Sequence, residues 1–361
     1  MSAAGLFRII GLDAREASDL GLAGGKCRSL AALTAAGLPV PSGFIVSTYA
    51  YREALLSLGL DREIEATLSN GEMETQEAAE AASRHIAGLL SRHSVPAALT
   101  EEIFRAYWML CEKLSRGSQI AVAVRSSATA EDLAEASFAG QQETYLNITG
   151  PERVVQAVRD CWASLFSPRA LLYRSQRCGR PLDSLAMAVG VQAMVPARVA
   201  GVLFTVNPRT GDPSEVVIEA SWGLGESVVG GSVTPDRYVV DKRTGKTIET
   251  HISQKMIEVV CSPHGTDHQQ VPLPKQCLPC LTLAHRERLA EIARDVEALF
   301  GVPQDIEWAI DASDDCFVLQ ARPVTTRPPT QSHSFTRSPA YQELYRSLNR
   351  NTSAPQGRSE G

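Results

Sequence analysis

The chain has 361 residues, enough for two folded cores, with a hydrophobic fraction of 44% and a charged fraction of 21%. Its formal net charge of −6 leaves no basic excess, which argues against nucleic acid or an acidic membrane surface as a partner. There is no apolar run long enough to span a bilayer and no signal peptide pattern, and the eight cysteines are scattered, so a soluble, cytoplasmic protein with reduced thiols is expected.

The first distinctive motif is a glycine pair followed by lysine, Gly24-Gly25-Lys26, placed ahead of a helical pattern that runs from Leu30 to Gly37. Glycine allows the backbone to approach a ligand closely, and lysine supplies a point charge for phosphate. The spacing is not that of a complete Walker A loop. A glycine pair that simply opens a helix is the favoured alternative for this motif taken by itself.

Helices are predicted for the alanine-rich region from Leu60 to Leu114 and for Val154 to Leu172, where apolar residues recur every three or four positions. Between these regions, Val122–Ala128 has the pattern of a short buried strand that carries Arg125 and hydroxyl groups. The following turn, residues 138–145, is rich in small residues and hydrogen-bond donors. Such a turn can lie over a triphosphate, although an ordinary hairpin has the same composition.

Further strands are predicted in the second half of the chain, over residues 189–195, 201–205 and 216–220, followed by Gly223-Leu224-Gly225-Glu226. Successive strands of this kind form a sheet whose inner face can hold a planar ligand. The polar, proline-rich segment 251–279 is expected to be a surface loop, and a helix is expected over residues 284–300.

The most informative stretch is a predicted hairpin formed by residues 304–310 and 318–323, which alternate polar with apolar side chains. With a four-residue loop, Asp311 would face Cys316 and Glu307 would face Gln320, with Arg322 two residues along the same face. A carboxylate, an amide oxygen and a guanidinium would then converge. Oxygen ligands bind a hard divalent cation, and the arginine fork grips phosphate oxygens, although a surface salt bridge is the alternative interpretation.

Taken together, the segments resemble the nucleotide-binding part of the phosphoenolpyruvate synthase, pyruvate phosphate dikinase and rifampin phosphotransferase family. The matching stretches, which occur in family order, are 24–26, 124–128, 138–142, 220–226, 305–309 and 319–323. They span roughly residues 5 to 326. The resemblance implies an α/β, two-lobed ATP-grasp fold that closes over ATP and Mg²⁺.

The resemblance also implies roles for individual residues. Lys26, Arg125 and Arg322 match the cationic residues that contact the phosphates during catalysis. Glu307 and Gln320 match the magnesium ligands. The remaining expected nucleotide contacts are Gly140, Gln141, Gln142 and Thr144 over the phosphates, Gln192 and Met194 beside the adenine, and Glu219 and Glu226 at the ribose or metal.

The expected organisation is an N-terminal lobe over residues 1–188, a C-terminal lobe with the nucleotide and metal site over 189–327, and a disordered tail over 328–361. None of the seven histidines lies in the Gly-Gly-x-x-x-Ser-His-Ala type of segment that carries the phosphohistidine in this family. The expected function is therefore an ATP-cleaving phosphotransferase component that passes phosphate to a separate acceptor protein. A self-sufficient kinase of a small molecule and a non-catalytic nucleotide-binding module are the alternatives.

Overall fold

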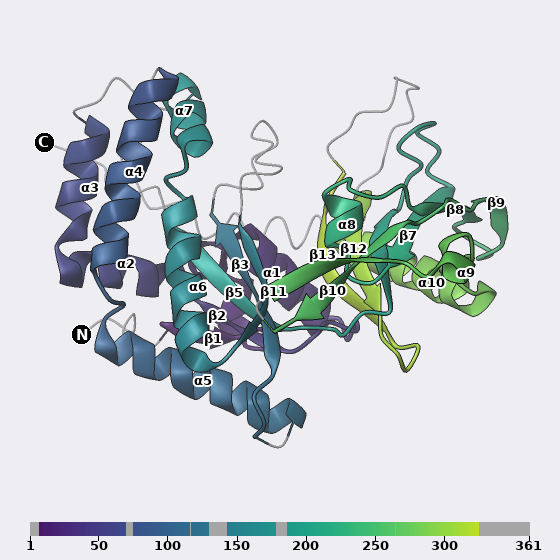
Figure 1. Cartoon of the computed structure of the whole chain (residues 1–361), viewed down its shortest axis with the longest axis horizontal. Coiled ribbons are helices and arrows are strands. Elements are labelled where there is room, and N and C mark those ends of the chain that lie inside the picture. Colours follow the sequence, from purple (N-terminus) through teal and green to yellow (C-terminus); the bar gives the residue numbers. More distant parts are fainter. Residues whose placement is uncertain are drawn as a thin grey trace, which may run out of the picture.

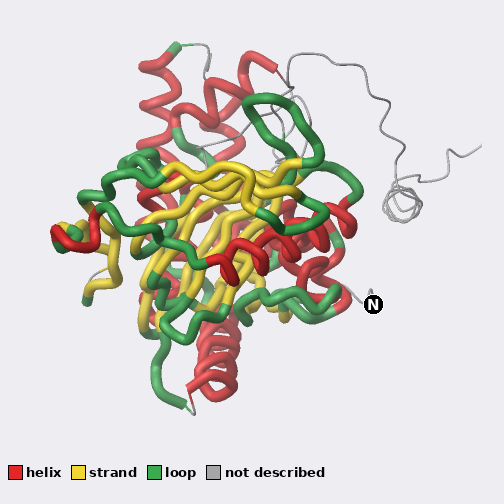
Figure 2. Tube along the Cα trace, turned by 90° about the vertical axis from the view of Figure 1, so that its right-hand side faces the viewer, coloured by secondary structure: helices red, strands yellow, loops and turns green. Residues whose placement is uncertain are grey.

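Two antiparallel sheets form the framework of the protein (Figure 1). The computed structural model describes residues 7–69, 75–115, 117–129, 143–177, 186–263 and 265–324. Strands lie at the centre and most helices lie at the periphery (Figure 2). The mixed α/β class predicted from the sequence is confirmed.

The first sheet has five strands in the order β1-β2-β5-β3-β4. The bounds are β1 Ile9–Gly11, β2 Gly43–Val46, β5 Met187–Ala193, β3 Ala121–Ala128 and β4 Thr144–Thr149. Alternation along β2 is clear, because Phe44 and Val46 enter one hydrophobic core and Ile45 enters another. Both faces of this sheet are therefore covered.

Six helices, α2 to α7, lie on the side of the first sheet that faces away from the second sheet (Figure 1). The N-terminal helices are η2 Arg15–Ser18, α1 Leu20–Ala35, α2 Thr48–Leu58, α3 Leu60–Ser69, α4 Gln76–Arg92, α5 Ala97–Ser115, α6 Pro151–Ser164 and α7 Pro168–Arg177. Ser47 and Thr75 cap α2 and α4 by accepting hydrogen bonds from backbone N–H groups of the first turn.

One predicted helix is divided in two. The expected helix over residues 154–172 is interrupted between Ser164 and Pro168, where α6 ends and α7 begins. Proline has no N–H to donate to the preceding turn, so it is favoured at the first position of a new helix. The single-helix prediction is therefore wrong at this point, although the helical residues on either side are as expected.

The second sheet has six strands in the order β13-β12-β6-β7-β8-β9. Their bounds are β13 Cys316–Pro323, β12 Gln304–Ile310, β6 Val199–Phe204, β7 Glu215–Trp222, β8 Asp236–Asp241 and β9 Thr247–His251. The helices of this part are α8 Glu226–Val229, α9 Leu273–Gln276 and α10 Leu283–Phe300. The predicted strands 201–205 and 216–220 and the predicted helix 284–300 are confirmed to within a few residues.

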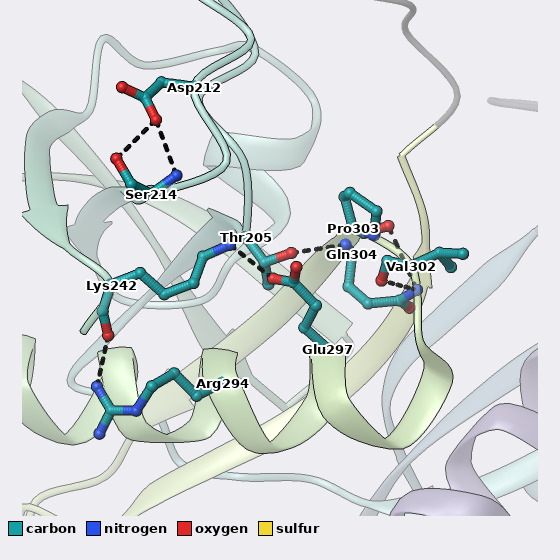
Figure 3. Close-up of polar contacts among 9 residues, drawn as sticks. All are labelled: Thr205, Asp212, Ser214, Lys242, Arg294, Glu297, Val302, Pro303 and Gln304. Atoms are coloured by element: carbon teal, nitrogen blue, oxygen red, sulfur yellow. Dashed lines mark hydrogen bonds and ion pairs between the residues drawn. The ribbon is translucent and has the colours of Figure 1, made fainter. Parts of the chain in front are cut away.

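Helix α10 packs against one face of the second sheet and is tied to it by polar contacts (Figure 3). Lys242, which follows β8, donates from Nζ to Glu297 Oε2 at 2.8 Å, and Arg294 Nη1 donates to the Lys242 carbonyl oxygen at 2.7 Å. At the end of the helix, Gln304 N donates to Thr205 Oγ1 at 2.9 Å. These bonds fix the start of β12 against the end of β6.

The segment 251–279 is not the surface loop expected from its composition. It contains β10 Ile257–Ser262 and β11 Gly265–Gln270, which pair with each other as a separate two-stranded sheet, and it ends in α9. Tertiary contacts with β4, β7 and α8 stabilise the hairpin despite its polar sequence.

Helix α1 lies between the two sheets and belongs to a core shared by both. That core contains Leu30 and Leu33 of α1, Ile45 of the first sheet, and Ile306 and Trp308 of the second.

The strand that begins near residue 189 was expected in the C-terminal lobe, whereas β5 pairs with β2 and β3 of the first sheet. The division into lobes stays a prediction. The last strand of the first sheet ends at Ala193, and the first strand of the second sheet begins at Val199. In the part of the chain that the structure describes, no helix is both long and apolar enough to cross a membrane.

Candidate functional site

A small pocket opens where α1, β3, β5 and β13 meet. Four polar residues singled out in the sequence line it: Lys26, Arg125, Gln192 and Gln320. They come from four different elements, and the apolar side of the same pocket is formed by Leu12 and Leu30. Alternation along β3 and β5 explains part of this arrangement. Alternate residues of the two strands, such as Val124 and Val191, enter the helix-covered core, so Arg125 and Gln192 emerge on the side of α1.

The backbone of α1 is kinked at Gly24, where φ is 70° and ψ is 174°. A Cβ atom at this position would lie 2.1 Å from the carbonyl oxygen of Ser127 on β3, so only glycine fits. Directly after the kink, Cys27 N donates to Ser127 Oγ at 3.1 Å. The helix begins earlier than expected: the glycine pair, predicted to precede the helix, lies inside α1, and Gly24 makes close contact with β3. This contact places Lys26 at the pocket.

Arg125 connects the first sheet to the hairpin of β12 and β13. Its Nη2 donates to Glu307 Oε2 at 2.9 Å, and its Nη1 donates to the carbonyl oxygen of Leu319 at 3.0 Å. The side chains of Arg125 and Glu307 are only 14% and 19% exposed. Among the described residues, Arg125 Nε is a buried nitrogen without a hydrogen-bond partner. Such a donor points to a polar ligand that would satisfy it.

The predicted pairing of Glu307 with Gln320 is confirmed, but the loop that joins β12 to β13 differs from the prediction. Ile310, and not Asp311, faces Cys316, so the loop has one residue more than expected. A β-bulge beside Glu307 and Trp308 restores the expected register. The bulged residue is Leu319, whose carbonyl accepts from Arg125.

A row of polar residues crosses the second sheet from Gln320 to Arg237. Glu307 pairs with Gln320 on one side and Val202 on the other, Val202 pairs with Glu219, and Glu219 pairs with Arg237. Side chains in register across a sheet share one face, opposite the face that packs in the shared core. Burial raises the pKa of Glu219, and Arg237 partly opposes that rise.

Arg322 is held by Asp305, its direct partner across the hairpin. Arg322 Nε and Nη2 approach Asp305 Oδ2 at 2.9 Å and 2.8 Å. The Asp305 side chain is 12% exposed, and this burial raises the pKa of its carboxyl group while Arg322 lowers it. Asp305 was missed in the sequence as a site residue. The period-two pattern would have found it, because it lies two residues before Glu307 on the same face.

Comparison with known families identifies the family of the chain. The pyruvate phosphate dikinase, AMP/ATP-binding domain family model matches residues 20–341. The chain belongs to this family. The resemblance inferred from the sequence is therefore confirmed, and nucleotide binding is the property that the family description carries.

Curated relatives of this AMP/ATP-binding domain are phosphoenolpyruvate synthases. The chain is 43% identical over 308 residues to a probable phosphoenolpyruvate synthase of Methanothermobacter thermautotrophicus, covering 85% of the chain and 44% of the relative. It is 44% identical over 316 residues to one of Methanocaldococcus jannaschii, covering 87% and 26%. It is 39% identical over 350 residues to the phosphoenolpyruvate synthase of Aeropyrum pernix, covering 88% and 42%. The chain thus spans less than half the length of these relatives.

Two solved structures show weaker likeness. The D-cycloserine synthetase DcsG is 13% identical in sequence, with a TM-score of 0.25, and the match covers 90% of this chain and 69% of the synthetase chain. The D-alanyl-alanine synthetase A of Vibrio cholerae is 11% identical, covers 75% and 60%, and has a TM-score of 0.27.

Thr144, Met194 and Glu226, which were also predicted as site residues, are not among the residues that line the pocket. Thr144 begins β4 and pairs with Arg125. Met194 follows β5, and its N–H donates to the Ala121 carbonyl at 3.0 Å. Glu226 begins α8 and accepts from Thr266 Oγ1 at 3.0 Å. Gly140, Gln141 and Gln142 lie outside the described residues.

The residues present fit a magnesium ion bound together with nucleotide. Glu307 and Gln320 offer a carboxylate and an amide oxygen from adjacent strand positions. The described residues include no cluster of three or more acidic, histidine or cysteine side chains for a metal. Mg²⁺ usually takes only one or two carboxylates from the protein and completes its shell with water and substrate phosphates. The orphaned Nε of Arg125 beside Glu307 is consistent with a phosphate at the same place.

Proposed function

We propose that this AMP/ATP-binding domain is an ATP-grasp phosphotransferase component that binds ATP with Mg²⁺ between its two sheets and cleaves it. The phosphate passes to an acceptor supplied by a separate partner protein. The observation that carries the proposal is the convergence of Lys26, Arg125, Gln192 and Gln320 on one pocket from four elements. The family to which the chain belongs supports the choice of nucleotide.

In this proposal each group of residues has a distinct task. Lys26 and Arg125 bind phosphate oxygens, and Arg322 binds the terminal phosphates. Glu307 and Gln320 would hold the Mg²⁺ ion, which would supply positive charge to the phosphates. The contacts proposed for the rest of the nucleotide are Gln192 and Met194 for adenine, Glu219 and Glu226 for ribose or metal, and Thr144 with the 140–142 segment for the phosphates.

Phosphoryl transfer depends mainly on charge stabilisation and on the exclusion of water. Phosphoryl transfer develops negative charge on the transferred group, and fixed cations in a water-poor site stabilise it more than in bulk solvent. Arg125 is 14% exposed and already fixed by two hydrogen bonds. Little further ordering of this side chain is needed when a phosphate accepts from Nε.

The proposal is tested by following each phosphate of labelled ATP. The purified protein is incubated with Mg²⁺ and ATP carrying label at the β or the γ position, alone and with candidate partner proteins. We expect binding of ATP, slow cleavage by the protein alone, and rapid cleavage with transfer of label once the acceptor is present. A Glu307→Gln variant is the matched control, because it keeps the shape of the side chain and removes the charge.

The possible outcomes separate the alternatives. Rapid transfer to a small molecule without a second protein would favour a self-sufficient kinase. ATP binding without cleavage under all conditions would favour a non-catalytic nucleotide-binding module. Absence of ATP binding would contradict the proposal as a whole.

A further inference from the structure

The β10–β11 hairpin is attached to both parts of the protein but belongs to neither main sheet. At its base it is held by the second part of the chain, where Leu224 N donates to the Val259 carbonyl at 2.8 Å and Gly223 forms a bridge with Val259. From there the hairpin extends across the middle of the molecule toward the first sheet (Figure 1). Its second strand lies against β4, the edge strand of that sheet.

At its other end the hairpin is held by one side chain of the first sheet. Asn147 of β4 donates from Nδ2 to the carbonyl oxygens of Ser262 and Gly265, at 2.6 Å and 2.7 Å. These two residues are the last pair of the hairpin. Both acceptors are carbonyl oxygens, so a single group that bonds both must donate two hydrogens, and the asparagine NH₂ group does so.

The backbone of β4 is irregular at Asn147. Its pairing register with β3 shifts between Val122 and Val124, opposite this residue. The φ angle of Asn147 is 57°, a left-handed conformation that asparagine adopts more readily than most residues other than glycine. This irregularity directs the side chain of Asn147 away from regular pairing, and its amide then bonds the hairpin.

The same hairpin also contacts a residue of the proposed nucleotide site. Thr266, next to Gly265, donates from Oγ1 to Glu226 Oε2 at 3.0 Å. The tip of the hairpin therefore connects the edge of the first sheet to Glu226, a predicted ribose or metal contact. The tip of the hairpin is bonded to Asn147 of the first sheet, and its base is bonded to the segment that follows β7 of the second sheet. The two sheets therefore cannot separate unless the bonds of Asn147 break.

We propose that the β10–β11 hairpin is a clasp between the two sheets, held at Asn147, and that its release controls entry and exit of nucleotide. A neutral clasp of two hydrogen bonds is strong enough to favour the closed arrangement and weak enough to open during turnover. The part of the inference that concerns nucleotide rests on the proposed function, whereas the clasp itself does not.

The primary test uses hydrogen exchange, which needs no ligand. In Asn147→Gly the carboxamide is removed while the left-handed backbone is retained without strain. Amides within residues 257–270 should exchange faster by on the order of tenfold, the factor expected when two ordinary hydrogen bonds are lost. Amides of β7 should be unchanged. Unchanged exchange in the hairpin would overturn the clasp.

The second arm measures nucleotide kinetics with a fluorescent ATP analogue and Mg²⁺ in a stopped-flow instrument. Asn147→Gly should raise the association and dissociation rates together, each by at least about threefold, with a smaller change in Kd, since a gate acts on both directions. Asn147→Asp, which keeps the size but loses the donors, should behave in the same way. A purely structural role would lower the melting temperature without accelerating both rates.

A matched control separates the clasp from general destabilisation. Asn207, at the end of β6, donates to Glu215 Oε2 at 2.6 Å and accepts from Arg209 N at 3.0 Å, so its bonds stay within one turn. Asn207→Ala should reduce stability and leave both nucleotide rates unchanged. Faster hairpin exchange with unaltered rates in Asn147→Gly would contradict the gating role. Failure of the unmodified protein to bind nucleotide would contradict both the proposed function and the gating role. The hydrogen-exchange experiment would still test whether Asn147 holds the hairpin.

Discussion

Arg125 Nη2 lies 2.9 Å from Glu307 Oε2, and the two residues are 182 positions apart in the sequence. The pair joins the proposed phosphate-binding arginine of one sheet to the proposed metal ligand of the other. Both side chains are more than four-fifths buried. Each charge is therefore compensated mainly by its partner and not by water, and a change in one alters the environment of the other.

Glu307→Ala should fold and yet lose magnesium-dependent ATP cleavage. The variant removes the proposed metal ligand and leaves Arg125 without its carboxylate, so we also expect a loss of about 3 kcal/mol in the free energy of unfolding. Denaturant titration and a phosphate-release assay measure the two effects. In the double variant with Arg125→Gln, the stability loss should be smaller than the sum of the single losses. Full residual activity in Glu307→Ala would exclude the metal assignment.

Arg322→Lys should lower turnover and leave ATP affinity nearly unchanged. Arg322 presents a flat fork of which Nε and Nη2 contact Asp305, whereas lysine has one point charge that cannot hold Asp305 and a phosphate in the same way. A contact that strengthens as phosphate departs affects rate more than binding. Steady-state kinetics and equilibrium binding provide the two numbers.

The control for this substitution is Arg198→Lys. Arg198 pairs with Asp314 at the far end of the same hairpin, so the same chemical change is made away from the pocket, and turnover should be retained. If Arg322→Lys reduced affinity and turnover equally, Arg322 would instead belong to ground-state binding.

Gly24→Ala should be strongly destabilising. A methyl group there would lie 2.1 Å from the Ser127 carbonyl oxygen, and the φ angle of 70° is unfavourable for alanine. Because the neighbour is backbone, the strand or the helix must move, and we expect a loss of more than about 3 kcal/mol in the free energy of unfolding. Gly37→Ala is the matched control, since its φ is 76° with nothing within 4 Å of the added atom. It should lose only about 1 kcal/mol, and equal losses would refute the packing argument.

Glu219→Gln should stabilise the protein at neutral pH. Burial raises the pKa of Glu219, so ionisation of this carboxyl costs more in the folded protein than in the unfolded chain. Stability contributed by the protonated form is present below the unfolded pKa and is lost as the pH rises through the folded pKa. Glutamine avoids that loss. Melting temperatures at pH 7 and pH 4 should differ between variant and parent only at the higher pH, and an equal difference at both would contradict the assignment.

The local pattern of polar and apolar residues predicted most of the helices and strands, and it predicted one pairing within the site. Alternation at period two in residues 304–310 and 318–323 predicts both strands of the terminal hairpin, and the pairing of Glu307 with Gln320 follows from it. The register survived an error in the loop because the bulge at Leu319 restores it. Helical periodicity likewise located α10. These features are predictable because neighbours in the chain decide them.

Contacts between distant segments were decided by tertiary packing alone. The sequence does not show that Gly24 must avoid Ser127, that Arg125 reaches Glu307, or that Asn147 holds the β10–β11 hairpin. Each of these joins residues about a hundred or more positions apart, and many partners are compatible with the local pattern at either end. Burial of α1 between the two sheets covers apolar side chains of both, and it brings Gly24 against Ser127 and the hairpin of Glu307 beside Arg125. Packing of the β10–β11 hairpin against β4 places it within reach of Asn147.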